Sequence, residues 1–144
     1  MRKKLILILA FVLALSTVLI GCSREEEIYV ITNRFFAQQL RRIQVNHNDY
    51  IGRTVQYDGM FMSSVCNVTG DAFYFIGQFA DDCCGGAAGG PEGFEVYLGS
   101  ITPVEDFTWV QVIGVLEEYH IPGLNDSILR VNIRTMVEIG IPGR

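Results

Sequence analysis

The feature that most constrains the fold of this chain is a series of five segments in which apolar and polar residues alternate. In the first segment Val55, Tyr57, Gly59 and Phe61 occupy one face, and the residues between them are more polar. A period of two places every second side chain on the same side, as in a half-buried β-strand. The five segments, each bounded by turn residues, are 54–62, 73–79, 94–98, 109–117 and 128–137.

Five strands of this length favour a small closed barrel over a two-sheet sandwich, which usually needs about seven strands. The sequence of residues 52–59 is similar to the long first strand of OB domains. In such a strand a residue without a Cβ atom, here Gly59, lets the backbone coil around the barrel. We therefore expect a mainly β, five-stranded OB-like barrel, with an open antiparallel sheet packed by one helix as the alternative.

A short strand and one helix are expected before these five strands. Residues 28–31 form a brief β-rich run, and Asn33 is a candidate N-cap for the helix that follows. Apolar residues then recur at near-helical spacing, with glutamines and arginines on the opposite face. The apolar positions are Phe35, Phe36, Leu40 and Ile43, and the polar residues 46–49 end the helix.

The N-terminus has the pattern of a bacterial lipoprotein leader. Three basic residues at positions 2–4 precede an uncharged apolar run at 5–15, and Leu-Ile-Gly-Cys at 19–22 resembles a lipidation site. We expect a signal peptide over 1–21, an acylated Cys22 at the start of a 22–27 tether, and one domain over 28–144. The alternative is an uncleaved anchor, since residues 5–21 are at the lower length limit for spanning a bilayer.

The charge balance excludes some partners. Removing the three basic leader residues leaves 8 basic residues against 16 acidic ones, a formal charge of −8. Nucleic acid binding requires cationic residues that displace phosphate counterions, so we expect no nucleic acid partner. The same balance argues against an electrostatic hold on anionic lipid, which leaves the acyl chains as the attachment to the bilayer. We expect a monomer.

Three short motifs lie along the predicted domain. They are Tyr50, Gly52, Arg53, Val55 and Gly59, then Cys83-Cys84 and Gly93, then Trp109, Val110, Val112, Gly114 and Leu116. These motifs resemble the C-terminal domain of the YcgQ-like bacterial proteins, a family labelled as candidate permease subunits. The resemblance covers about residues 33–137, and not the multi-helix membrane half of that family. It therefore implies the fold and an envelope location more than a transport activity.

The cysteines suggest a metal site. If the strands follow the OB order, Cys66 lies at the top and Cys83 and Cys84 at the bottom, and at about 3.3 Å per strand residue they are roughly 20 Å or more apart. That separation excludes a disulfide between them. His120 is expected at the bottom end, where thiolate and imidazole would suit zinc or copper(I). His47, Asp49, Asp81 and Asp82 are expected at the same end.

Other interpretations of these residues stay open. Cys83 and Cys84 could be half-buried structural residues, or a strained vicinal disulfide in a redox sensor. A cysteine nucleophile with His120 as base lacks an identifiable orienting residue. The glycine-rich 85–90 segment lacks the following Lys-Ser/Thr of a phosphate-binding loop. The aromatic residues Tyr57, Phe73, Phe75 and Trp109 could stack on bases, but are expected as core and cross-strand pairs.

Together these patterns predict a non-enzymatic, membrane-anchored extracytoplasmic binding module. A more specific version of this prediction is that the module binds zinc through Cys83, Cys84 and His120. The alternatives are a structural adaptor that docks an envelope membrane protein and a thiol redox sensor.

Overall fold

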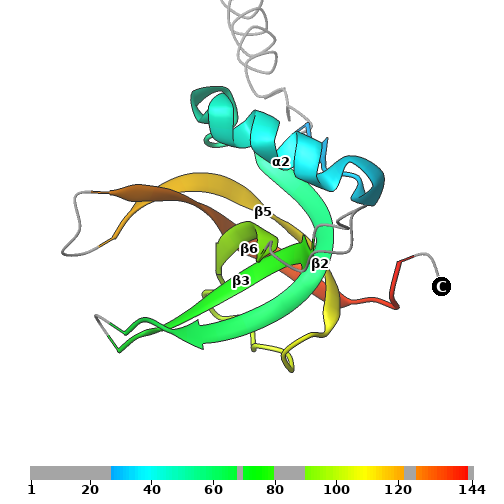
Figure 1. Ribbon diagram of the computed structural model, residues 1–144, viewed down its shortest axis with the longest axis vertical. Helices are drawn as coiled ribbons and strands as arrows, with labels where there is room; N and C mark the ends of the chain where they lie inside the picture. The colour runs from blue at the N-terminus through cyan, green and yellow to red at the C-terminus, as the bar shows by residue number, and fades with distance from the viewer. Residues whose placement is uncertain (1–26, 68–69, 80–89, 122–125, 143–144) are drawn as a thin grey trace, which may run out of the picture.

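The computed structural model describes residues 27–67, 70–79, 90–121 and 126–142. A short strand and three helical segments come first, and five strands follow (Figure 1). The first part consists of β1 (Tyr29–Val30), the 3-10 helix η1 (Asn33–Phe35), α2 (Phe36–Val45) and the 3-10 helix η2 (His47–Asp49). The strands are β2 (Thr54–Val65), β3 (Ala72–Phe79), β4 (Pro91–Tyr97), β5 (Trp109–His120) and β6 (Ser127–Glu138).

The five long strands pair in a closed ring. Strand β2 is antiparallel to β3 on one side and to β5 on the other, and β3 is antiparallel to β4. Strand β6 closes the ring, because it is parallel to β4 over Arg130–Asn132 and antiparallel to β5. This order confirms the OB-like arrangement, including the antiparallel pairing of the first and fourth long strands, and it excludes the open sheet.

The core lies inside the ring. Alternate residues of every strand point inward, and Val55, Val112 and Leu116 are fully buried. Helix α2 lies across one end of the ring (Figure 1) and buries Phe36, Leu40 and Ile43. Their spacing of four and three residues places them on one helix face, as the sequence predicted. Phe35, which was expected on the same face, precedes α2 and is 50% exposed. The α2 helix therefore covers the core at that end.

The prediction that Asn33 caps the helix is wrong. Thr32 precedes η1 and Phe35 precedes α2, and neither makes a side-chain capping bond. The Asn33 side chain instead donates to Asp58 Oδ2 at 3.1 Å and accepts from Gln78 Nε2 at 2.8 Å. A local capping pattern was thus overridden by tertiary hydrogen bonds to β2 and β3. The helix does end at Val45, before the predicted polar segment.

Two glycines allow neighbouring strands to approach closely. A Cβ atom at Gly59 would lie 2.9 Å from Cγ2 of Ile76 and 3.0 Å from the backbone nitrogen of Gly77. A Cβ atom at Gly114 would lie 2.5 Å from the backbone oxygen of Asn132, next to a register shift between β5 and β6. Strands β2 and β5 therefore bend at residues that carry no side chain.

Among the described residues, no helix has both the length and the apolar character needed to cross a membrane. The expected leader, the Cys22 acylation site and most of the tether lie outside the described residues.

Candidate binding cleft

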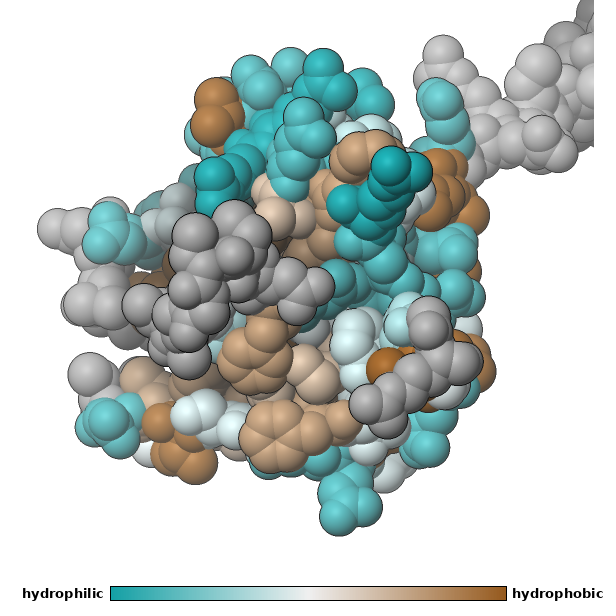
Figure 2. Space-filling view, turned by 45° about the vertical axis from the view of Figure 1, so that its right-hand side comes forward, coloured by the Kyte–Doolittle hydropathy of each residue, from teal (hydrophilic) through white to brown (hydrophobic). Residues whose placement is uncertain are grey.

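Two hairpins project on the same side of the ring and enclose a cleft. Strands β2 and β5 pair with each other only over Thr54–Met60 and Trp109–Val115. Beyond that seam β2 continues with β3, and β5 continues with β6, so the two hairpins separate (Figure 1). Figure 2 shows the hollow between their ends at the left edge of the molecule, with hydrophobic side chains in it.

This geometry corrects one prediction. Cys66 and His120 were expected at opposite ends of the barrel, but Cys66 lines the same cavity as Tyr119 and Ile121, the two neighbours of His120. The expectation assumed straight strands. Because β2 and β5 are bent, their far ends curl over one face instead. The distance from Cys66 to Cys83 and Cys84 stays untested, since both of those residues lie outside the described part of the chain.

The cleft consists of two adjoining cavities that share Phe73 and Glu95. One has a volume of about 550 Å³ and the other about 500 Å³. Both lie against the outer surface of β3 and β4, since Glu95 and Tyr97 alternate with the core residues Phe94 and Val96. The larger cavity is also lined by Cys66, Asp71, Tyr97, Tyr119, Ile121 and Arg130, and the smaller by Gln44, His47, Phe75, Glu118, Ser127, Ile128 and Leu129.

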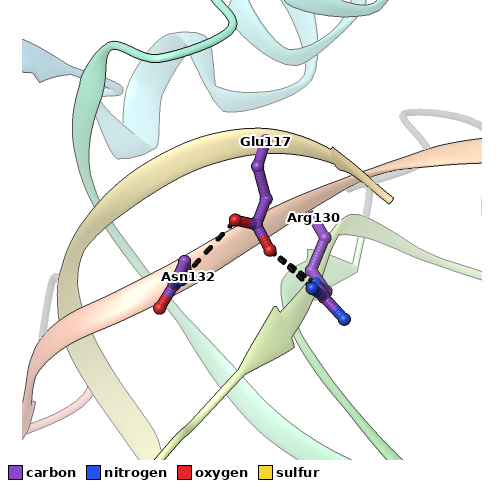
Figure 3. Close-up of polar contacts among 3 residues, drawn as sticks. All are labelled: Glu117, Arg130 and Asn132. Atoms are coloured by element: carbon purple, nitrogen blue, oxygen red, sulfur yellow. Dashed lines mark hydrogen bonds and ion pairs between the residues drawn. The ribbon is translucent and has the colours of Figure 1, made fainter. Parts of the chain in front are cut away.

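Arg130 organises the wall of the larger cavity. Its guanidinium lies 3.8 Å from the ring centroid of Tyr119 and 5.0 Å from that of Tyr97. Nη2 and Nε of Arg130 donate to the same Glu117 carboxylate oxygen at 2.6 Å and 2.9 Å. Figure 3 shows Glu117 of β5 directed toward Arg130 and Asn132 of β6. The arginine thus holds two aromatic rings and one carboxylate in fixed positions.

The cleft carries more acidic than basic groups. Asp71, Glu95 and Glu118 line it, whereas its one lining arginine, Arg130, is already paired with Glu117. Burial raises the pKa of Glu95, and the positive charge of Arg130, its register partner on β6, partly offsets that rise. Partial burial of the carboxyl explains the direction of the pKa shift, because burial disfavours the charged form.

The predicted metal ligands are only partly placed. His120 is exposed at the end of β5, and Cys83, Cys84, Asp81 and Asp82 lie outside the described residues. His47 lines the smaller cavity together with Glu118 and Ser127, so it does lie near the β5–β6 hairpin, as expected. Within the described ranges, no three His, Cys, Asp or Glu residues form a group that could hold a metal ion.

Sequence reasoning missed most of the cleft. Tyr57 is buried in the core as expected, and burial raises the pKa of its hydroxyl. Phe73, also expected as a packed side chain, is 37% exposed and lines both cavities. Tyr97, Tyr119 and Arg130 were not singled out. Tyr97 had one signal, because it falls on the polar face of the predicted segment 94–98, where an aromatic residue is unusual. Arg130 lies on the polar face of segment 128–137, and Tyr119 lies just beyond the predicted end of segment 109–117.

The fold and the cleft define a class: a small, mainly β protein with an OB-like ring and an open aromatic cleft on its outer surface. The family model described as the DUF1980 C-terminal domain matches residues 16–144, and the chain belongs to that family. This membership is consistent with the resemblance to the C-terminal domain of the YcgQ-like proteins. No curated protein matches the sequence significantly.

Proposed function

We propose that this protein is a membrane-anchored, extracytoplasmic binding module whose ligand occupies the cleft between the β2–β3 and β5–β6 hairpins. The observation that carries the proposal is the pair of adjoining cavities, with aromatic rings held by Arg130 at their wall. Open clefts lined by aromatic side chains and a few placed polar groups are typical binding sites. In OB-folds the hairpin loops flanking this strand face commonly contact ligands.

The chemistry of the cleft favours a neutral or cationic ligand of extended shape. Phe73 and Tyr97 are 37% and 50% exposed, and with the partly buried Tyr119 they give the larger cavity an aromatic lining suited to stacking. The excess of carboxylates over the one paired arginine repels phosphates and other polyanions. Neutral oligosaccharides and peptides without acidic side chains meet both conditions. The proposal assigns no catalysis to the cleft.

The location rests on the leader sequence. Acylation of Cys22 would hold the domain at the outer side of a membrane, in the cell membrane or the outer envelope. Replacing Cys22 by serine removes the thiol that accepts the lipid. Metabolic labelling with a fatty acid should mark the wild type and leave the Cys22→Ser protein unlabelled, and equal labelling of both would contradict the anchor.

Titration of the isotopically labelled protein by NMR tests the cleft. The probes are a neutral oligosaccharide, a lysine-rich peptide and single-stranded DNA. We expect one of the first two to shift resonances of Tyr97 and Tyr119, and DNA to shift none. Tyr119→Ala should lower the affinity about five- to 150-fold, because a lost stacking contact is worth about 1–3 kcal/mol.

Phe107→Ala is the matched control for this titration. Phe107 is an aromatic residue that is 64% exposed and lines neither cavity. Its replacement should leave the affinity unchanged. Equal losses in both variants, or shifts confined to residues outside the cleft, would contradict the proposal.

The zinc site stays a prediction of the sequence. Elemental analysis of the purified protein, with Cys84→Ser and His120→Ala as variants, tests whether zinc is bound and whether these residues hold it. Thiol titration with intact mass measurement tests the redox alternative. An adaptor for an envelope membrane protein becomes the better account if the protein contains no metal and binds none of the probes.

A further inference from the structure

We infer that the exposed face of α2 lies against the anionic headgroups of the same membrane that holds the Cys22 anchor. This inference rests on the proposed anchor. It concerns a surface distinct from the cleft, and it assigns an orientation of the domain on the bilayer.

The formal charges are segregated along the chain. Residues 28–53 contain Arg34, Arg41, Arg42 and Arg53 but only one acidic residue, Asp49. Residues 54–142 contain 12 acidic residues and only Arg130 and Arg134 as basic ones. Residues 28–53, which include α2, are therefore cationic at +3 and residues 54–142 are anionic at −10, while the tether 22–27 carries −2. The total charge of the chain conceals this separation.

The cationic residues share one exposed face of α2. At about 100° per residue, Gln38, Arg41, Arg42 and Val45 fall within an arc of about 100°, opposite the three buried residues. Arg41 and Arg42 are exposed, and Arg41 makes only a long contact of 3.5 Å to Glu92. Arg34 precedes α2 and is exposed as well.

Apolar side chains accompany these charges. Val45 is 78% exposed on the face just described, and Phe35 beside Arg34 is 50% exposed. A helix that presents basic residues together with exposed apolar ones is suited to a headgroup surface. There the basic residues face anionic lipid and the apolar ones are buried at the boundary between headgroups and acyl chains. If α2 faced only water, the Val45 side chain would have no such apolar surroundings.

The length of the tether brings this face to the bilayer. Residues 22–27 span at most about 20 Å, and the chain then enters β1, which leads directly into η1 and α2. Residues 54–142, at −10, are repelled by an anionic surface, while each arginine near that surface adds roughly fivefold to the population held there. Both effects turn α2 toward the membrane.

A single tryptophan reporter tests this orientation. The chain contains only Trp109, so Trp109→Phe provides a background on which Val45→Trp reports from α2 and Phe107→Trp from the loop before β5. That loop and α2 lie on opposite sides of the ring (Figure 1). The lipidated protein, purified from bacterial membranes, is reconstituted into vesicles containing brominated phosphatidylcholine, with or without 30% phosphatidylglycerol.

We expect the Val45→Trp protein to be quenched at least twofold more than the Phe107→Trp protein in anionic vesicles. Adding Arg34→Glu, Arg41→Glu and Arg42→Glu should lower quenching to the level seen in neutral vesicles. If the protein floats with the vesicles but the two reporters are quenched equally, the orientation is overturned and the anchor stands. If the protein fails to float with either vesicle, the anchor is overturned, and the orientation with it.

Discussion

The seam where β2 pairs with β5 and the two hairpins beyond it are made of the same strands, yet they differ in burial. At the seam, Val55 and Val112 are fully buried, and the ring is closed. In the hairpins, Val65 is 58% exposed and Tyr97, on the adjoining β4, is 50% exposed. The comparison indicates that closure of the ring buries the core, whereas separation of the hairpins leaves open the surface at which we propose that a ligand binds.

The largest effect is expected when Leu116 of the closed ring and Leu129 of the β5–β6 hairpin are each replaced by alanine. Leu116 is fully buried at the seam, whereas Leu129 is partly buried beside the smaller cavity. Leu116→Ala should lower the free energy of unfolding by about 3–4 kcal/mol, because it leaves a cavity in a closed core. Leu129→Ala should cost about 1 kcal/mol. Denaturant titration measures both, and equal losses would contradict the division.

Arg130→Ala should have an intermediate effect on stability. It removes two cation–π contacts and leaves the Glu117 carboxylate, which is 32% exposed, without its cationic partner. We expect a loss of about 2–3 kcal/mol. Arg130→Lys keeps the charge but not the planar contacts, and should recover less than half of the loss. Full recovery by lysine would show that charge alone matters at this position.

Tyr97→Ala should affect binding far more than folding. Half of the Tyr97 side chain is exposed, and its described ring contact is the 5.0 Å approach of Arg130. The free energy of unfolding should fall by less than about 1 kcal/mol. The affinity for the probe that occupies the cleft should fall about tenfold. A large loss of stability would mean that the cleft wall supports the core.

The smallest expected effect is a pH dependence from Glu95. Burial raises its pKa in the folded protein above the ordinary value of 4.5, so the folded state retains the proton longer than the unfolded state does. Its contribution to stability is therefore greatest below the unfolded pKa and decreases as the pH rises through the folded pKa. Glu95→Gln should flatten this part of the profile, measured by thermal unfolding between pH 4 and 7.

The strands and the core could be predicted from the sequence because alternation reports directly which side chains face inward. Strand ends were less accurate. Strand β2 continues to Val65 and β5 to His120, beyond the predicted ends at 62 and 117, because polar residues such as Ser63 and Glu118 break the alternation without breaking the backbone pairing.

The cleft could not be predicted because it depends on curvature. A period of two does not show where a long strand bends, so straight-strand distances placed Cys66 and His120 at opposite ends. The cation–π contacts of Arg130 also join β4, β5 and β6, which are separated by turns of unpredictable direction. The sequence indicated that the first strand coils at Gly59, but the direction and extent of the bends at Gly59 and Gly114 require coordinates.

The three-residue pairing of β6 with β4 has a consequence for the order in which the protein can fold. Thr54 pairs with Val115, about 60 residues later, and β6 is the last strand of the chain. A growing chain without β6 leaves one edge of β4 and one edge of β5 without their partner. Unpaired edges invite association with other chains. The described domain is therefore most vulnerable to aggregation just before the residues of β6 become available, and folding that awaits such distant contacts is slow.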